Sequence, residues 1–216
     1  MRYFNRTIEH YRNYKKENEV RKLHLGAGNI HLEGWFNVDI NPKLDNSIYF
    51  LNMLQMPYPF TKDSFDYIFS EHNFEHFTLK EMYYILKECL RILKPNGVLR
   101  IAIPDLKKLI NFYLKNKKKH EEYCAFSIEN YIPFAKEHNL NNKAIVLNNF
   151  FRGWGHKFIY DYETMKNVLE QCGYKSVHQC CISKSRHRHL KNLESHWEEI
   201  GKDFNNLETM VIEAKK

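Results

Sequence analysis

The chain has 216 residues, a formal net charge of +7 and a hydrophobic fraction of 43%, with aromatic residues at 15%. This length suits one α/β domain, and the hydrophobic fraction excludes an intrinsically disordered chain. No apolar run approaches the roughly 20 residues that a membrane-spanning helix needs, and the first residues lack the apolar core of a signal peptide. The five cysteines form no C-x-x-C pair and indicate reduced thiols, so we expect a cytoplasmic protein.

The hydrophobic pattern predicts a helix over residues 1–19, followed by strands that alternate with helices. Strands are expected at residues 20–25, 36–40, 47–52, 65–70, 98–103, 175–183 and 208–214. Helices are expected at residues 79–93, 106–114 and 162–171. Such alternation is typical of a Rossmann-like, mostly parallel sheet with helices on both faces. Residues 115–155 break the alternation, so we interpret them as a helical insertion or cap within one domain that spans residues 1–216.

A glycine turn follows the first expected strand and indicates a cofactor site. Gly26 and Gly28 flank Ala27, and glycine lets a backbone turn sharply and approach a ligand closely. Asp39 ends the second expected strand, where a carboxylate can accept both hydroxyl protons of a ribose. A dinucleotide site would carry a third glycine where His31 stands, and its acid would come later, about 20 residues after the turn. A cofactor without a pyrophosphate fits better, so we expect S-adenosylmethionine.

Several longer motifs resemble class I S-adenosylmethionine-dependent methyltransferases, and most of all the small bacterial type 11-like group often found in surface-polysaccharide pathways. The motifs lie at residues 24–28, 33–40, 64–72, 75–77, 90–101, 104–105 and 156–174. The resemblance covers about residues 20–183 and implies seven strands, the last of them antiparallel. One departure is His24, which stands where the family carries an acid two residues before the first glycine.

The resemblance also implies which residues hold the cofactor. The glycines would line its methionyl part, Asp39 would hold the ribose hydroxyls, and Asn52 with Met53 would lie at the adenine. The implied cofactor-binding residues are Gly26, Ala27, Gly28, Asp39, Ile40, Asn52, Met53, Ser70, Glu71 and His72.

Two histidines are candidate catalytic residues, because an alcohol acceptor benefits from a general base whose pKa lies near neutrality. His156 is the first candidate, since it follows Arg152 and Trp154 in a glycine-containing loop that can close on a substrate. His76, after the fourth expected strand, is the second candidate. Both histidines also have a structural interpretation, in which they only satisfy backbone groups. We expect Arg152 and Trp154 to contact the substrate.

A basic cluster follows the sixth expected strand. Guanidinium groups match phosphate oxygens, so Arg186 and Arg188 are candidates for an anion clamp, with a solvated surface as the alternative. The net charge of +7 also favours anionic partners, so we expect a small anionic acceptor, phosphorylated or linked to a nucleotide or sugar. His187 and His189 have no carboxylate cluster near them in the sequence, and no metal site is expected.

A second hypothesis is an RNA methyltransferase, or a non-catalytic relative that binds nucleic acid through its basic surface. The sequence shows no appended RNA-binding motif. The D/N-P-P-Y/F motif of DNA base methylation is also missing after the fourth expected strand, where residues 70–73 are Ser-Glu-His-Asn. Nucleic acid is therefore the less favoured partner.

Overall fold

The computed structural model describes residues 2–41 and 47–216, and within them seven strands form one sheet. The strands are β1 (Lys22–Leu25), β2 (Phe36–Asp39), β3 (Tyr49–Phe50), β4 (Phe65–Glu71), β5 (Leu93–Pro104), β6 (Lys175–Cys180) and β7 (Thr209–Lys215). Their order is β3-β2-β1-β4-β5-β7-β6. The first five strands pair in parallel, whereas β7 runs antiparallel to both β5 and β6. The predicted Rossmann-like sheet with an antiparallel last strand is confirmed.

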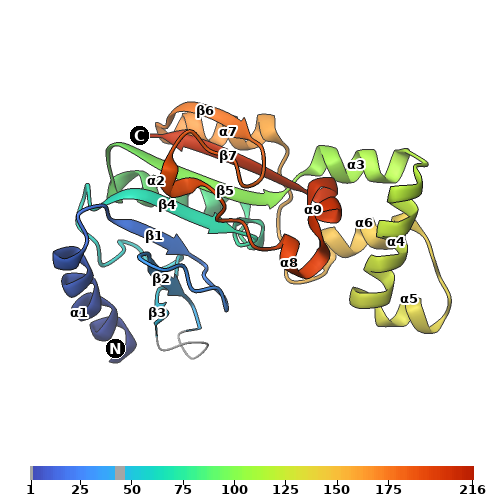
Figure 1. The fold of residues 1–216 in the computed structure, drawn as a ribbon, viewed down its shortest axis with the longest axis horizontal. Helices are drawn as coiled ribbons and strands as arrows, with labels where there is room; N and C mark the ends of the chain where they lie inside the picture. The colour runs from blue at the N-terminus through green and yellow to red at the C-terminus, as the bar shows by residue number, and fades with distance from the viewer. Residues whose placement is uncertain (1, 42–46) are drawn as a thin grey trace.

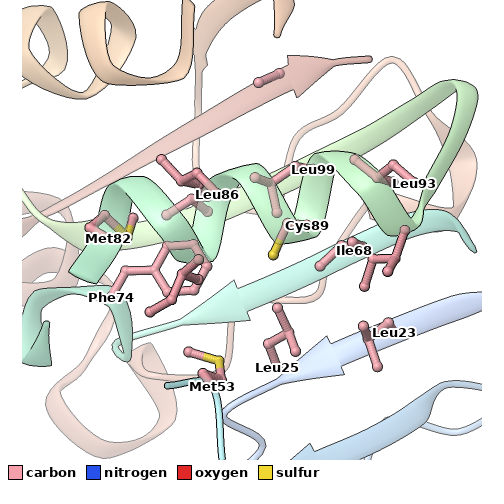
Figure 2. Packing of buried hydrophobic residues seen from close by; sticks show 14 of the residues in the cluster. Leu23, Leu25, Met53, Ile68, Phe74, Met82, Leu86, Cys89, Leu93 and Leu99 are labelled. Atoms are coloured by element: carbon pink, nitrogen blue, oxygen red, sulfur yellow. The ribbon is translucent and has the colours of Figure 1, made fainter. Parts of the chain in front are cut away.

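The main hydrophobic cluster joins the sheet to three helices, α1 (Arg2–Glu17), α2 (Leu79–Ile92) and α7 (Tyr162–Cys172). A capping box starts α2: the Thr78 hydroxyl accepts the Glu81 N–H, and the Glu81 carboxylate accepts the Thr78 N–H. Figure 2 shows Leu86 and Cys89 of α2 above Ile68 of β4, all three being fully buried. Packing of this helix therefore fixes β4, whose carboxyl end carries the polar residues Ser70, Glu71 and His72.

The opposite face of the sheet is covered by the connection between β6 and β7, which includes the 3-10 helix η2 (Arg188–Leu190). Leu190 and Leu193 of this connection pack with Trp35 and Phe69 in a smaller hydrophobic cluster. The connection thus supplies an apolar cover of its own and is held firmly against the sheet.

An ion network beneath this connection ties it to the sheet. Arg100 of β5 is fully buried, its Nε donates to Glu194 at 2.6 Å, and its Nη1 donates to Glu213 at 2.5 Å. Charged groups remain buried only when they are paired, so Arg100 requires both carboxylates. The network links β5, β7 and the connection between β6 and β7.

A helical cap lies beyond the carboxyl ends of β4 and β5 (Figure 1). It contains α3 (Leu106–Leu114), α4 (Lys118–Tyr131), α5 (Pro133–Glu137) and α6 (Lys143–Arg152). Two short helices, α8 (Trp197–Ile200) and α9 (Lys202–Glu208), lie beside it (Figure 1). Phe112, Tyr123, Val146 and Phe150 belong to a hydrophobic cluster separate from that of the sheet. The cap therefore has its own core, and α4 to α6 occupy the predicted insertion over residues 115–155.

Several boundaries differ from the prediction for local reasons. Only Tyr49–Phe50 of the expected strand at 47–52 pairs with β2. β5 begins at Leu93, directly after α2, because Leu93 already pairs with Phe65. β6 stops at Cys180, where a turn closed by the Lys184 N–H and the Cys181 carbonyl begins. Within residues 2–41 and 47–216, each helix is too short or too polar to span a bilayer.

Candidate active site

The glycine turn after β1 is bonded directly to the end of β2. Gly26 and Gly28 have φ angles of 68° and 53°, which favour glycine. The Gly28 N–H donates a 3.0 Å hydrogen bond to Oδ2 of Asp39. A Cβ added at Gly28 would meet no atom of residues 2–41 or 47–216 within 4 Å, so the described part of the chain leaves space for a ligand there. The turn and the carboxylate form a single unit that fits a ribose-bearing cofactor.

Exposed apolar side chains follow the ends of β2 and β3. Ile40, immediately after Asp39, is 64% exposed, and Leu54 is 46% exposed. Oδ1 of Asn52 accepts the Leu54 N–H at 3.0 Å and so shapes the turn after β3. Large exposed aliphatic side chains at this edge of the sheet suit a flat heterocycle attached to a sugar. These residues therefore fit an adenosine group.

Asn73, which sequence reasoning did not select, fills the space beside the glycine turn. A Cβ on Gly26 would lie 2.4 Å from Cγ of Asn73, so this close approach requires glycine. Asn73 donates to Oγ of Ser70 at 3.2 Å and contacts Sδ of Met53 at 3.6 Å. Ser70 in turn donates to the Leu25 carbonyl at 2.9 Å. The predicted residues Ser70 and Met53 thus meet at the first glycine.

Glu71 and His72 both have their polar atoms engaged by other parts of the chain. The Glu71 carboxylate accepts the N–H and hydroxyl of Ser195 and the N–H of His196, so it anchors the segment before α8. Nδ1 of His72 lies 3.2 Å from Glu75, and its Nε2 lies 3.2 Å from the Thr209 hydroxyl. Burial lowers the pKa of His72, but the hydrogen bond and charge of Glu75 outweigh it and raise the pKa to about 9. His72 is therefore a cation at neutral pH.

A cavity of about 340 Å³ lies between the ends of β4 and β5, the cap and α8. Its volume is in the range of small-molecule sites. Its polar lining includes four histidines and three glutamates, and no lysine or arginine occurs among the described residues that line it. The cavity histidines are His72, His76, His156 and His196, and the glutamates are Glu75, Glu199 and Glu208.

The two predicted catalytic histidines meet in this cavity. The rings of His76 and His156 lie 5.0 Å apart, next to Glu75. Burial lowers the pKa of His156 more than the charge of Glu75 raises it. His72 holds the Glu75 carboxylate and, despite burial, lowers its pKa. A neutral imidazole beside a buried carboxylate can take a proton or bind a cation.

Aromatic rings form the cap side of the cavity. Trp154 has a φ of 52°, and its ring lies 5.5 Å from those of Tyr131 and His156. Tyr131 donates to Glu199 at 2.9 Å, and Tyr123 donates to Glu208. The predicted substrate contact at Trp154 has the required position, while the acidic residues here were not predicted. Glu208 was not predicted because it ends the connection between β6 and β7, which contains no recognisable motif.

Comparisons with known proteins agree with this geometry. Residues 36–101 match a family model described as a methyltransferase domain. A SAM-dependent methyltransferase from Archaeoglobus fulgidus is 18% identical, with 97% of this chain and 91% of that chain covered and a TM-score of 0.52. One from Mesorhizobium loti is 12% identical, with 91% of each chain covered and a TM-score of 0.51. At these identities the likeness is one of fold. No curated protein matches the sequence.

The chain thus carries a match to a methyltransferase domain over residues 36–101 and has the fold of S-adenosylmethionine-dependent methyltransferases. In such parallel sheets ligands bind at the carboxyl ends of the strands, and the Gly26–Gly28 turn, Asp39 and Ile40 lie at the carboxyl ends of β1 and β2. The open backbone at Gly28 and the exposed aliphatic side chains fit S-adenosylmethionine.

The segment that carries the two arginines predicted to clamp an anion does not line the cavity among the described residues. His187 and His189, the neighbours of Arg186 and Arg188, contact Tyr67 near the start of β4, which is the end of the sheet away from the cavity. The connection crosses the sheet because Arg100 and Glu194 hold it there. Both arginines are exposed, and Arg152 is also exposed and does not line the cavity.

His24 is a buried core residue that bonds to Asn37. Its Nδ1 lies 3.0 Å from Oδ1 of Asn37, and its ring stacks on Phe69 at 5.3 Å. Burial lowers its pKa to about 4, against weaker opposing effects of Asn37 and Asp39. The ring is thus neutral, and the acid that the family carries here has no counterpart at His24.

Proposed function

We propose that this protein transfers a methyl group from S-adenosylmethionine to a small acceptor in the cavity beneath the cap. One observation carries the proposal: the segment after β4 touches both sites. Asn73 packs on Gly26 of the glycine turn, while its neighbours His72, Glu75 and His76 line the cavity. A molecule in the cavity is therefore placed beside the reacting end of the cofactor, and proximity is the main requirement of methyl transfer.

S-adenosylmethionine, when bound, supplies a methyl group attached to a sulfonium sulfur, and the resulting thioether is a good leaving group. The residues of the chain orient the acceptor and remove its proton. His76 and His156 are the candidates for this task, because their rings meet at the cavity wall. Nδ1 of His156 lies 2.8 Å from the Phe150 carbonyl, which only accepts, so Nε2 keeps its lone pair. Activation of the acceptor is assigned to these two residues and Glu75.

Charge and resemblance bear on the class of acceptor. The net charge and the resemblance to enzymes of surface-polysaccharide pathways favour an anionic acceptor that is phosphorylated or linked to a nucleotide or sugar. The described lining offers such an anion the charge of His72 but no lysine or arginine, and it also carries three glutamates. A further positive charge is required at this site if the acceptor is an anion.

A small acceptor is favoured over nucleic acid by the size of the site. A cavity of about 340 Å³ holds a single small molecule, whereas an RNA substrate would need an open groove lined with cations. The exposed arginines lie at the other end of the sheet. RNA methylation remains the second candidate, and it predicts steeply salt-dependent binding.

Release of S-adenosylhomocysteine tests the proposal. Purified protein is incubated with S-adenosylmethionine and a panel of phosphorylated amines, nucleotide sugars and short RNAs. Turnover with a member of the first two groups, lost in His156→Ala by roughly 10²–10⁴-fold, supports it. Turnover with RNA alone, or no binding of S-adenosylmethionine in calorimetry, contradicts it.

A further inference from the structure

A group of metal-ligand side chains converges at the cavity. One carboxylate oxygen of Glu75 and one ring nitrogen each of His76 and His156 lie within 4.8 Å of one another. Glu75 is only 1% exposed, and its Oε2 accepts no hydrogen bond from any residue that the structure describes. A buried carboxylate oxygen without a donor is costly, so this oxygen requires either a hydrogen-bond donor or a cation as its partner.

The three side chains are held in place by neighbouring groups. Oε1 of Glu75 is fixed by Nδ1 of His72 at 3.2 Å, which leaves Oε2 for another partner. The hydrogen bond from Nδ1 of His156 to the Phe150 carbonyl leaves Nε2 as the free nitrogen of that ring. The two N–H groups after His156 also donate to the Glu75 carbonyl, at 2.8 and 3.2 Å. Metal-ligating histidines and carboxylates are typically held by such outer hydrogen bonds.

We propose that Glu75, His76 and His156 bind one divalent transition-metal cation in the cavity. Two imidazoles and one carboxylate suit Mn²⁺, Fe²⁺, Co²⁺ or Zn²⁺, and three protein ligands leave positions open for a substrate. A second cluster of His72, His196 and Glu208 also lines the cavity. It suits a cation less well, because both ring nitrogens of His72 already have partners.

The cation adds a second positive charge to that of His72 in a cavity lined by three glutamates. This role of the cation rests on the proposed methyltransferase function. An oxygen of an anionic acceptor binds at an open position of the cation, close to the glycine turn. With the cation bound, Nε2 of His156 is a ligand and no longer a free base, so the cation takes over activation of the acceptor oxygen. The acceptor is then held by the cation instead of the exposed arginines. The acidic lining and the anionic acceptor become compatible.

Metal titration tests the site directly. Metal ions are removed from untagged protein with a chelator, and the chelator is then removed by dialysis. The protein is titrated with MnCl₂ while the electron paramagnetic resonance signal of free Mn²⁺ is followed. Calorimetric titration with ZnCl₂ gives a second measurement. We expect one equivalent per chain. Glu75→Gln and His156→Ala should each weaken binding by at least about 10-fold. His178→Ala is the matched control, because His178 belongs to a separate group with Cys180 and Glu213.

The proposal is overturned if neither Mn²⁺ nor Zn²⁺ binds at millimolar concentration. It is also overturned if Glu75→Gln and His156→Ala keep wild-type affinity, or if His178→Ala alone loses it. Thermal melts of each variant separate the loss of a ligand from unfolding. Titration of the same proteins with S-adenosylmethionine distinguishes the two proposals. If the protein binds the cation but not S-adenosylmethionine, only the proposed function is contradicted. If it binds S-adenosylmethionine but not the cation, only the cation site is contradicted.

Discussion

The N–H of Gly28 and Oδ2 of Asp39 are joined by a 3.0 Å hydrogen bond that links the ends of β1 and β2. Oδ1 of the same carboxylate accepts the Asn41 N–H at 2.8 Å. Asp39 thus shapes the loop on each side of the cofactor position before any ligand binds, and its remaining lone pairs are free for ribose hydroxyls.

Asp39→Ala should weaken S-adenosylmethionine binding by about 1.5–3 kcal/mol, which is the loss expected for hydrogen bonds to a charged group. Calorimetric titration measures the change. Asp203→Ala, at an exposed position on α9, serves as the control and should bind normally. Wild-type affinity in a folded Asp39→Ala protein would remove Asp39 from the site.

Replacement of Arg186 or Arg188 by alanine should leave the acceptor KM within about 2-fold of wild type, because exposed surface changes cost little. Their neighbours His187 and His189 contact Tyr67 near the start of β4, away from the cavity. Steady-state kinetics with any acceptor found in the S-adenosylhomocysteine assay measures this. A large rise in KM for either variant would show that the connection moves toward the cavity in the working enzyme.

His24 should make the stability of the fold depend on pH. Burial lowers its pKa to about 4 from an ordinary value of 6.5, so between these values the unfolded chain binds a proton that the folded protein does not. The stability from this site is fully present above pH 6.5 and declines as the pH falls toward 4, by roughly 3 kcal/mol in total. Urea unfolding of wild type and His24→Gln over this range measures it. A constant difference between the two proteins would contradict the assignment.

Breaking the buried network of Arg100 should strongly destabilise the fold. Glu194→Gln removes one of two carboxylates that pair with the fully buried guanidinium, and loss of one partner from a buried pair costs about 3–5 kcal/mol. Urea unfolding gives the free energy. Glu122→Ala is the control, since its pair with Lys118 is exposed and worth about 0–1 kcal/mol. Equal effects of the two variants would be inconsistent with a structural role for Arg100.

Hydrogen exchange should show lower protection in α4 to α6 than in the central strands, because the cap has a separate hydrophobic cluster and can open by itself. S-adenosylmethionine together with an acceptor should increase the protection of residues 115–155. If the empty protein already protects these helices as fully as β4 and β5, the cap is a rigid insertion.

Local patterns in the sequence were sufficient to predict the strands of the sheet. They also predicted which residues lie at the carboxyl ends of β1, β2 and β4. Alternating apolar segments predicted each of the seven strands, because burial of one strand face or helix face repeats at a fixed period along the chain. The glycine turn, Asp39 and the exit of β4 also lie where the chain order implies, since parallel strands bring their carboxyl ends to one edge.

The cavity and its charges were decided only by the tertiary structure. Glu208, Glu199 and His196 reach the cavity from a connection without a motif, and Glu75 matters because its neighbours leave one oxygen unpaired. The position of the arginines could not be predicted because the connection between β6 and β7 is bonded to Arg100, which is buried in β5, through Glu194 and the Lys184 carbonyl. Such contacts join residues far apart in the chain, and no local period encodes them, whereas helices, strands and turns follow from neighbours a few residues away.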